Sequence, residues 1–76
     1  MTDLKYSLVI EATADPEFFC FYSPDLEGFT GAGRSVEDCL CRAKGGMEEF
    51  VAVLREEGFT VPPENPAAQI QIHDHA

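Results

Sequence analysis

Two acidic side chains are the first candidates for chemistry in this chain of 76 residues. Metal-dependent hydrolysis of a phosphodiester needs several carboxylates that converge on a divalent cation. Glu11 and Asp25 are the only tempting candidates, because they fall on or near the expected sheet. The competing interpretation makes Glu11 a surface acid at the end of a strand and Asp25 a residue that shapes a turn through its own backbone. We favour this second interpretation, so the sequence predicts no catalytic residue and no enzyme.

The three cysteines are the second group with possible reactivity: Cys20, Cys39 and Cys41. A nucleophilic thiolate needs a neighbouring base or cation that lowers its pKa. Arg42 follows Cys41, but no histidine lies near, and Cys39 falls on the apolar stripe of a predicted helix. Three cysteines cannot form a full disulfide framework, and no secretory signal precedes them. We therefore expect inert, reduced thiols in a cytoplasmic protein.

Two further segments resemble ligand sites. The residues His73, Asp74 and His75 could chelate zinc weakly, but a structural zinc site usually needs four ligands. The segment 28–33 is rich in glycine, but no lysine follows it, so it makes a poor phosphate loop. The sequence therefore predicts no metal and no cofactor, and residues 73–76 are expected to form a flexible polar tail.

The charge balance narrows the class of partner. Fourteen acids against five bases give a formal net charge of −9. This charge disfavours direct binding of nucleic acid and of anionic membranes, because both depend on Lys and Arg contacts. A basic protein would be attracted, although the acidity could also serve solubility alone. No apolar run approaches the roughly 18–20 residues that span a bilayer.

The elements that position these residues follow from apolar periodicity. Strands are predicted over residues 4–12, 17–23, 29–33 and 68–72, and a helix begins at Ser35. Short turns make the first three strands antiparallel, and a crossover places the last strand beside the first and parallel to it. The sequence thus predicts an α+β domain, β-β-β-α-β, with a mixed sheet in the order 3-2-1-4. The helix packs on one face, and the opposite face is expected to be uncovered.

The helix has clear start and stop signals. Ser35 can cap its first turn, and Gly58 is placed to end it in a left-handed conformation. Gly45 and Gly46 interrupt the pattern, each at a cost of about 1 kcal/mol relative to Ala. We expect these glycines to allow close packing on the sheet rather than a hinge. The apolar stripe comprises Val36, Cys39, Leu40, Ala43, Met47, Phe50, Val51 and Leu54.

The second strand is apolar on both of its faces. One face must meet the helix, and the other is expected to meet another copy of the chain or another protein. Aromatic side chains could also stack on bases, but the net charge disfavours this and aromatic residues are enriched at protein interfaces. The candidate interface residues are Phe18, Cys20, Tyr22, Asp25, Leu26 and Phe29.

Several of these segments, in this order, resemble the HicB antitoxin family. The matching pieces are a first strand, an aromatic second strand, a Pro-Asp-Leu-x-Gly turn, a Gly-rich entry to a capped helix, and a helix exit followed by prolines. They are found at residues 6–11, 18–22, 23–28, 31–38 and 54–58. Together they cover roughly residues 4–72, so residues 1–76 are interpreted as one HicB-like domain. Glu27 departs from the pattern, which usually has a second proline there.

The resemblance implies a partial RNase H-like fold and a role in binding. In that family the domain binds and blocks HicA, a small basic toxin that cleaves mRNA, and members commonly self-associate. Full-length members usually carry a C-terminal DNA-binding module, which nothing here encodes, so we expect no operator binding. The alternative function is a homo-oligomeric orphan domain of the same fold with another protein or a small molecule as its partner.

Overall fold

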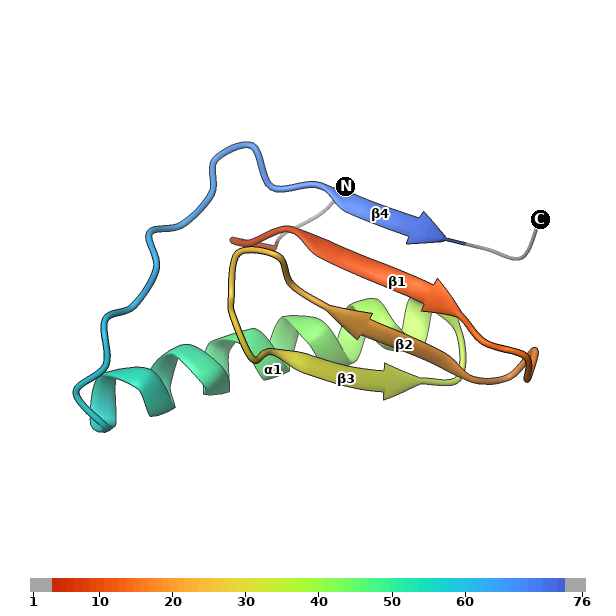
Figure 1. The fold of residues 1–76 in the computed structure, drawn as a ribbon, viewed down its shortest axis with the longest axis horizontal. Helices are drawn as coiled ribbons and strands as arrows, with labels where there is room; N and C mark the ends of the chain where they lie inside the picture. The colour runs from red at the N-terminus through yellow and green to blue at the C-terminus, as the bar shows by residue number, and fades with distance from the viewer. Residues whose placement is uncertain (1–3, 74–76) are drawn as a thin grey trace.

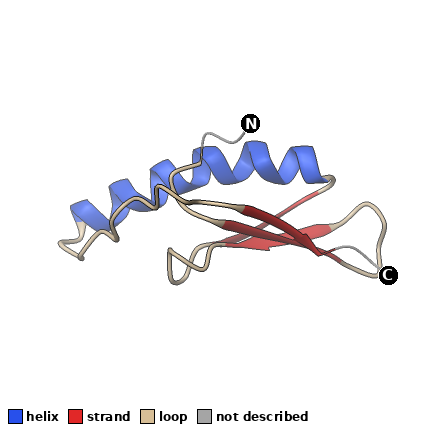
Figure 2. Cartoon of the chain, turned by 90° about the horizontal axis from the view of Figure 1, so that it is seen from above, coloured by secondary structure: helices blue, strands red, loops and turns tan. Residues whose placement is uncertain are grey.

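The computed structural model describes residues 4–73 as a four-stranded sheet with one long helix on one face (Figures 1 and 2). This is the predicted α+β class. The elements in chain order are β1 (Leu8–Ala12), β2 (Phe19–Tyr22), β3 (Thr30–Gly33), α1 (Val36–Glu56) and β4 (Ile70–His73).

The sheet has the predicted order and directions. Its strands follow the order β3-β2-β1-β4, with β1 and β3 both antiparallel to β2. After α1 the chain returns along the sheet, and β4 runs parallel to β1 with Leu8 opposite Ile70 (Figure 1). The central position of β1 explains its apolar run, because this strand has a neighbour on each side and a helix above it.

The segment before β1 is not a strand, although its alternation predicted one from residue 4. Tyr6 is buried, but its hydroxyl donates to the carbonyl of Pro62 at 2.7 Å. The backbone N–H of Ser7 donates to the carboxylate of Asp25 at 2.8 Å. These side-chain bonds, with one backbone bond from the Asn65 N–H to the Lys5 carbonyl at 2.8 Å, thus replace a strand ladder in this segment. Periodicity cannot distinguish the two because burial alternates in both.

The core lies between the sheet and α1. Leu8 and Ile10 of β1 are fully buried, and Cys39, Ala43 and Met47 of α1 pack against this side of the sheet. Full burial of a Leu or Ile side chain contributes roughly 1.5–3 kcal/mol, so these few contacts supply much of the stability of a small domain.

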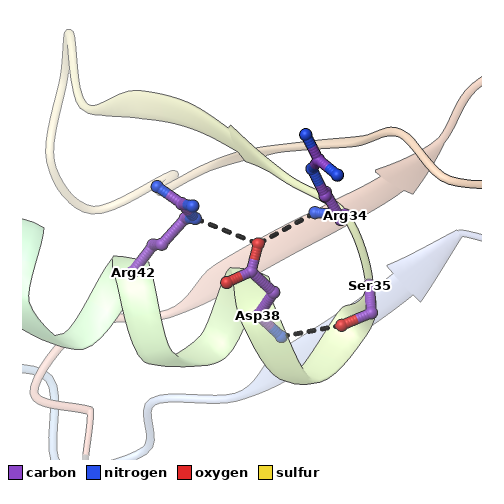
Figure 3. Close-up of polar contacts among 4 residues, drawn as sticks. All are labelled: Arg34, Ser35, Asp38 and Arg42. Carbon is purple, nitrogen blue, oxygen red and sulfur yellow. Dashed lines mark hydrogen bonds and ion pairs between the residues drawn. The ribbon is translucent and has the colours of Figure 1, made fainter.

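The start of α1 is a compact polar cap (Figure 3). Ser35 precedes the helix, and its hydroxyl accepts a hydrogen bond from the backbone N–H of Asp38 at 3.0 Å. Oδ2 of Asp38 accepts from the backbone N–H of Arg34 at 2.9 Å and from Nε of Arg42 at 3.0 Å. These bonds, first that from the Arg34 backbone, lower the pKa of the Asp38 carboxyl. The predicted N-cap is confirmed.

The helix continues unbroken through Gly45 and Gly46. A Cβ atom at Gly46 would lie 3.2 Å from the ring of Phe29, whereas one at Gly45 would meet nothing within 4 Å. Close packing against the sheet side is therefore confirmed for Gly46 only. Gly58 has φ of +78° and ends the helix in the left-handed conformation that was predicted.

Candidate functional site

The two faces of the sheet carry different neighbours. Leu8 and Ile10 point toward α1, so the alternation of a strand directs Val9 and Glu11 to the opposite side. Figure 2 shows α1 on one side of the sheet only, and α1 is the only helix of residues 4–73. We call the uncovered side the open face. Its strand residues include Val9, Glu11, Cys20, Tyr22, Gln71 and His73.

The centre of the open face is apolar. Val9 is only 6% exposed although it lies outside the core beneath α1. Its cross-strand neighbours are Tyr22 on β2 and Gln71 on β4, which flank it on either side. Tyr22 itself is 40% exposed, so its ring presents apolar area to solvent and its hydroxyl presents a polar tip. This combination is typical of residues at the centre of protein interfaces.

A polar row lies next to this centre. Glu11 is paired with Cys20 on β2 and with His73 on β4. Oε2 of Glu11 lies 3.5 Å from Nδ1 of His73, and both side chains are about half exposed. Such an exposed pair contributes little to stability, because solvent screens it. The row therefore gives the open face polarity and charge beside its apolar centre.

Phe18 lies at the end of the open face, next to the turn between β1 and β2. Its ring is 44% exposed and lines a shallow hollow of about 350 Å³ together with Asp15, Glu17 and Arg34. Three of the predicted interface residues, Phe18, Cys20 and Tyr22, thus lie on or beside one uncovered surface, as their alternation along β2 predicted.

Leu26 and Phe29, also predicted at the interface, are instead buried in the core of this chain. The turn between β2 and β3 folds Leu26 inward, and the N–H of Phe29 donates to the Leu26 carbonyl at 3.0 Å. The Phe29 ring packs against Phe21 and Phe50, with centroids 5.9 and 5.7 Å apart. Leu26 and Phe29 are therefore buried within this chain, Phe29 partly by α1, and they are not available to the partner that the sequence predicted for them.

The Asp25 side chain connects three segments of the chain by hydrogen bonds. Its Oδ2 accepts from the Ser7 N–H at 2.8 Å and from Nδ2 of Asn65 at 3.1 Å. These bonds, first that from Ser7, lower the pKa of the Asp25 carboxyl. The turn itself uses the Ser23 hydroxyl, which accepts from the Asp25 N–H at 3.2 Å. The interpretation of Asp25 as a residue that shapes only its own turn was therefore incomplete.

The two candidate catalytic acids do not converge. Asp25 is bonded to Ser7, four residues before Glu11 on the same segment, which corresponds to roughly 13 Å along an extended chain. Within residues 4–73 no group of three or more His, Cys, Asp or Glu side chains is placed to hold a metal ion. His73 belongs to β4 rather than to a tail, because it pairs with Glu11, whereas Asp74 and His75 lie outside the described residues.

The cysteines occupy three different environments. Cys39 is buried in the core, and this burial raises the pKa of its thiol. Cys20 is half-buried on the open face, and Cys41 is exposed on α1. A raised pKa disfavours the thiolate, so Cys39 fits the structural role that its place on the apolar stripe predicted.

The site also contains residues that the sequence did not assign to an interface. Val9 belongs to the open face because it alternates with Leu8 and Ile10, and Gln71 and His73 belong to it because β4 pairs with β1 in this register. The alternation of residues 68–73 predicted a strand, but it did not predict which of its residues would lie beside Val9. Asn65 was missed as well, because its role depends on a contact with Asp25 that lies forty residues away in the chain.

Comparisons with known proteins give no match for this chain, whether with family models, with curated proteins or with solved structures. The resemblance to the HicB family therefore depends on the motifs quoted above. Among residues 4–73, no helix has both the length and the apolar composition that a membrane span requires.

Proposed function

We propose that this chain is a non-enzymatic protein-binding module of the cytoplasm that resembles a HicB antitoxin. It binds a partner through the open face, and the partner is a small basic RNA-cleaving protein of the HicA type. The observation that carries the proposal is the uncovered sheet face with the exposed Tyr22 at its centre, in a chain of net charge −9.

The charge supports a basic partner. Long-range attraction between an acidic protein and a basic one raises the rate of encounter and falls with ionic strength. Glu11 places one acid within the open face itself, next to its apolar centre. A partner with an exposed Lys or Arg beside an apolar patch would match both features.

The size of the sheet shows how far the interface must extend. Four strands of up to five residues, spaced by about 4.8 Å, present a face of roughly 15 by 17 Å. That area is well below the roughly 800 Å² that each partner buries in a standard interface. The contact must therefore extend past the sheet, toward Phe18 at one end or along an edge strand.

The proposal is tested with two variants that each place a charge at an exposed apolar position. Tyr22→Glu alters the open face, and Val53→Glu alters an exposed residue of α1. A tagged chain is used to recover a basic protein from its native cell extract, and the purified partner is assayed for RNA cleavage. We expect the wild type and Val53→Glu to inhibit cleavage, and Tyr22→Glu to lose both binding and inhibition.

Two results would contradict the proposal. Equal inhibition by both variants would remove the open face as the binding surface, and a partner without RNA-cleaving activity would remove the antitoxin role. Salt provides a further check, because the association rate of a steered pair falls between low and physiological ionic strength.

A homo-oligomer is the second candidate, and the two edges of the sheet favour it. In the described part of the chain, β3 and β4 each have one neighbour and therefore one unpaired side. Edge strands readily pair with a second chain, and a domain of this size gains stability from added burial. Light scattering of the same two variants discriminates between the candidates: a dimer that both variants retain, with no partner recovered, supports self-association through an edge strand, and a dimer that only Tyr22→Glu disrupts supports self-association through the open face.

A further inference from the structure

A second surface, separate from the open face, has the character of a ligand site. A groove of about 630 Å³ lies between the C-terminal half of α1 and the extended segment 61–64. Its apolar lining comes from Leu4, Tyr6, Met47, Val51, Val61 and Pro62. This volume falls within the range of small-molecule sites, and charged side chains contribute to the lining beside these apolar ones.

Specific contacts hold the outer wall of the groove away from the helix. The Tyr6 hydroxyl donates to the Pro62 carbonyl at 2.7 Å, and the Asn65 N–H donates to the Lys5 carbonyl at 2.8 Å. Pro62 and Pro63 restrict the backbone between these anchors to extended conformations. The wall is therefore tied to the segment before β1 and cannot easily collapse onto α1.

The helical wall is one continuous stripe. It consists of Lys44, Met47, Glu48, Val51 and Arg55, which recur at steps of three and four residues. The distance from Lys44 to Arg55 along the helix axis is roughly 16 Å. The groove is thus elongated, with Met47, Glu48 and Val51 in the middle of this wall and a basic residue near each end.

The charge of the lining is opposite in sign to that of the protein. Three of the five bases of the chain line the groove, Lys5, Lys44 and Arg55, against two of its fourteen acids. Lys5 lies 3.6 Å from Glu64 at the rim. The lining therefore carries one excess positive charge on a protein of net charge −9, and this charge complements an anion with an apolar body.

We propose that this groove binds a small organic acid, with an extended apolar chain lying along Met47 and Val51 and a carboxylate directed to Arg55. The guanidinium of Arg fits a carboxylate with two parallel hydrogen bonds, which Lys cannot provide. The proposal is independent of the proposed function, since the groove lies on the helix side of the molecule and shares no lining residue with the open face.

Octanoate and octanol are the probes that test this proposal, because they share the apolar chain and differ in the acid. Each is titrated into the isotope-labelled 76-residue protein, and amide chemical shifts are followed by NMR. We expect octanoate to shift Met47, Val51 and Val61, and octanol to bind the same residues several-fold more weakly. Shifts confined to other residues, or equal affinity for the two probes, would overturn the proposal.

Matched charge variants locate the carboxylate. Arg55→Gln should weaken octanoate binding roughly threefold to fivefold, the range of an exposed ion pair, and leave octanol binding unchanged. Arg34→Gln makes the same change of charge outside the groove and should have little effect. An equal loss in both variants would show only a response to net charge and would contradict the site. Tyr22→Glu should retain octanoate binding, which separates this proposal from the proposed function.

Discussion

The two faces of the sheet differ although the same strands build both. On the helix side Leu8 and Ile10 have no exposed surface, and they share one core cluster with Cys39, Ala43 and Met47 of α1. On the open face Val9 lies between Tyr22 and Gln71 of the flanking strands and is 6% exposed, whereas Tyr22 is 40% exposed. The two faces therefore have different roles: the helix side determines stability, and the open face leaves the exposed surface of Tyr22 for a second molecule.

The largest expected effect separates the residues of the two faces within β1. Ile10→Ala removes a side chain from the sealed core and should lower the free energy of unfolding by about 2–5 kcal/mol. Val9→Ala should lower it by about 1.5 kcal/mol, because it removes two buried methyl groups at about 0.8 kcal/mol each. Denaturant titration measures both, with Glu11→Ala as a control that should change little.

Equal losses of unfolding free energy for Ile10→Ala and Val9→Ala would contradict the proposed difference between the two faces. Such a result would mean that the open face is as fully packed in solution as the helix side, for example in a dimer. Repeating the titrations over a range of protein concentrations would identify that cause, because dimer stability depends on concentration.

A smaller effect is expected from Asp25, which belongs to neither face. Its carboxylate bonds the Ser7 N–H and Asn65, so Asp25→Asn should lower the free energy of unfolding at neutral pH by about 1 kcal/mol. The folded-state pKa of Asp25 is lowered, so its contribution is present above the unfolded pKa of about 3.9. It is lost as pH falls from there through the folded pKa.

The pH dependence is measured as a difference between variants. Thermal unfolding of the wild type and of Asp25→Asn should converge as the solution is made more acidic than the folded pKa. Asp38, whose pKa is also lowered, is present in both proteins and cancels from the difference. Glu27→Gln, an exposed acid of the same loop, is the matched control. A constant difference in stability between the wild type and Asp25→Asn at all pH values would contradict a stabilising role of the Asp25 carboxylate.

Much of the fold could be predicted from the sequence because it depends on local signals. The Ser35 cap, the Gly58 stop and the alternation in β1 each involve neighbouring residues, and the short turns with one crossover predicted the order β3-β2-β1-β4. The candidate site was predicted only in part, since Phe18, Cys20 and Tyr22 follow from the alternation along β2.

The remaining features depend on contacts between distant segments. Whether Phe29 meets a partner or the helix is decided by Phe50 and by the missing side chain at Gly46. The role of Asp25 depends on its hydrogen bonds with Ser7 and Asn65. The groove depends on the hydrogen bond from the Tyr6 hydroxyl to the Pro62 carbonyl. Periodicity indicates that a residue is buried, but it does not indicate which segment buries it.

The smallest expected effect tests how tightly the helix lies on its face of the sheet. Gly45→Ala should raise the free energy of unfolding by about 1 kcal/mol, because Ala has the higher helix propensity and the added methyl meets nothing within 4 Å. Gly46→Ala has the same gain in propensity, but its methyl would lie 3.2 Å from Cε1 of Phe29. That ring is held between Phe21 and Phe50, so strain should cancel or exceed the gain. Thermal unfolding of the pair gives the answer directly: a clear difference in sign or size confirms a rigid helix side, whereas equal stabilisation would show that the Phe29 ring yields and that this face is less tightly packed than its burial indicates.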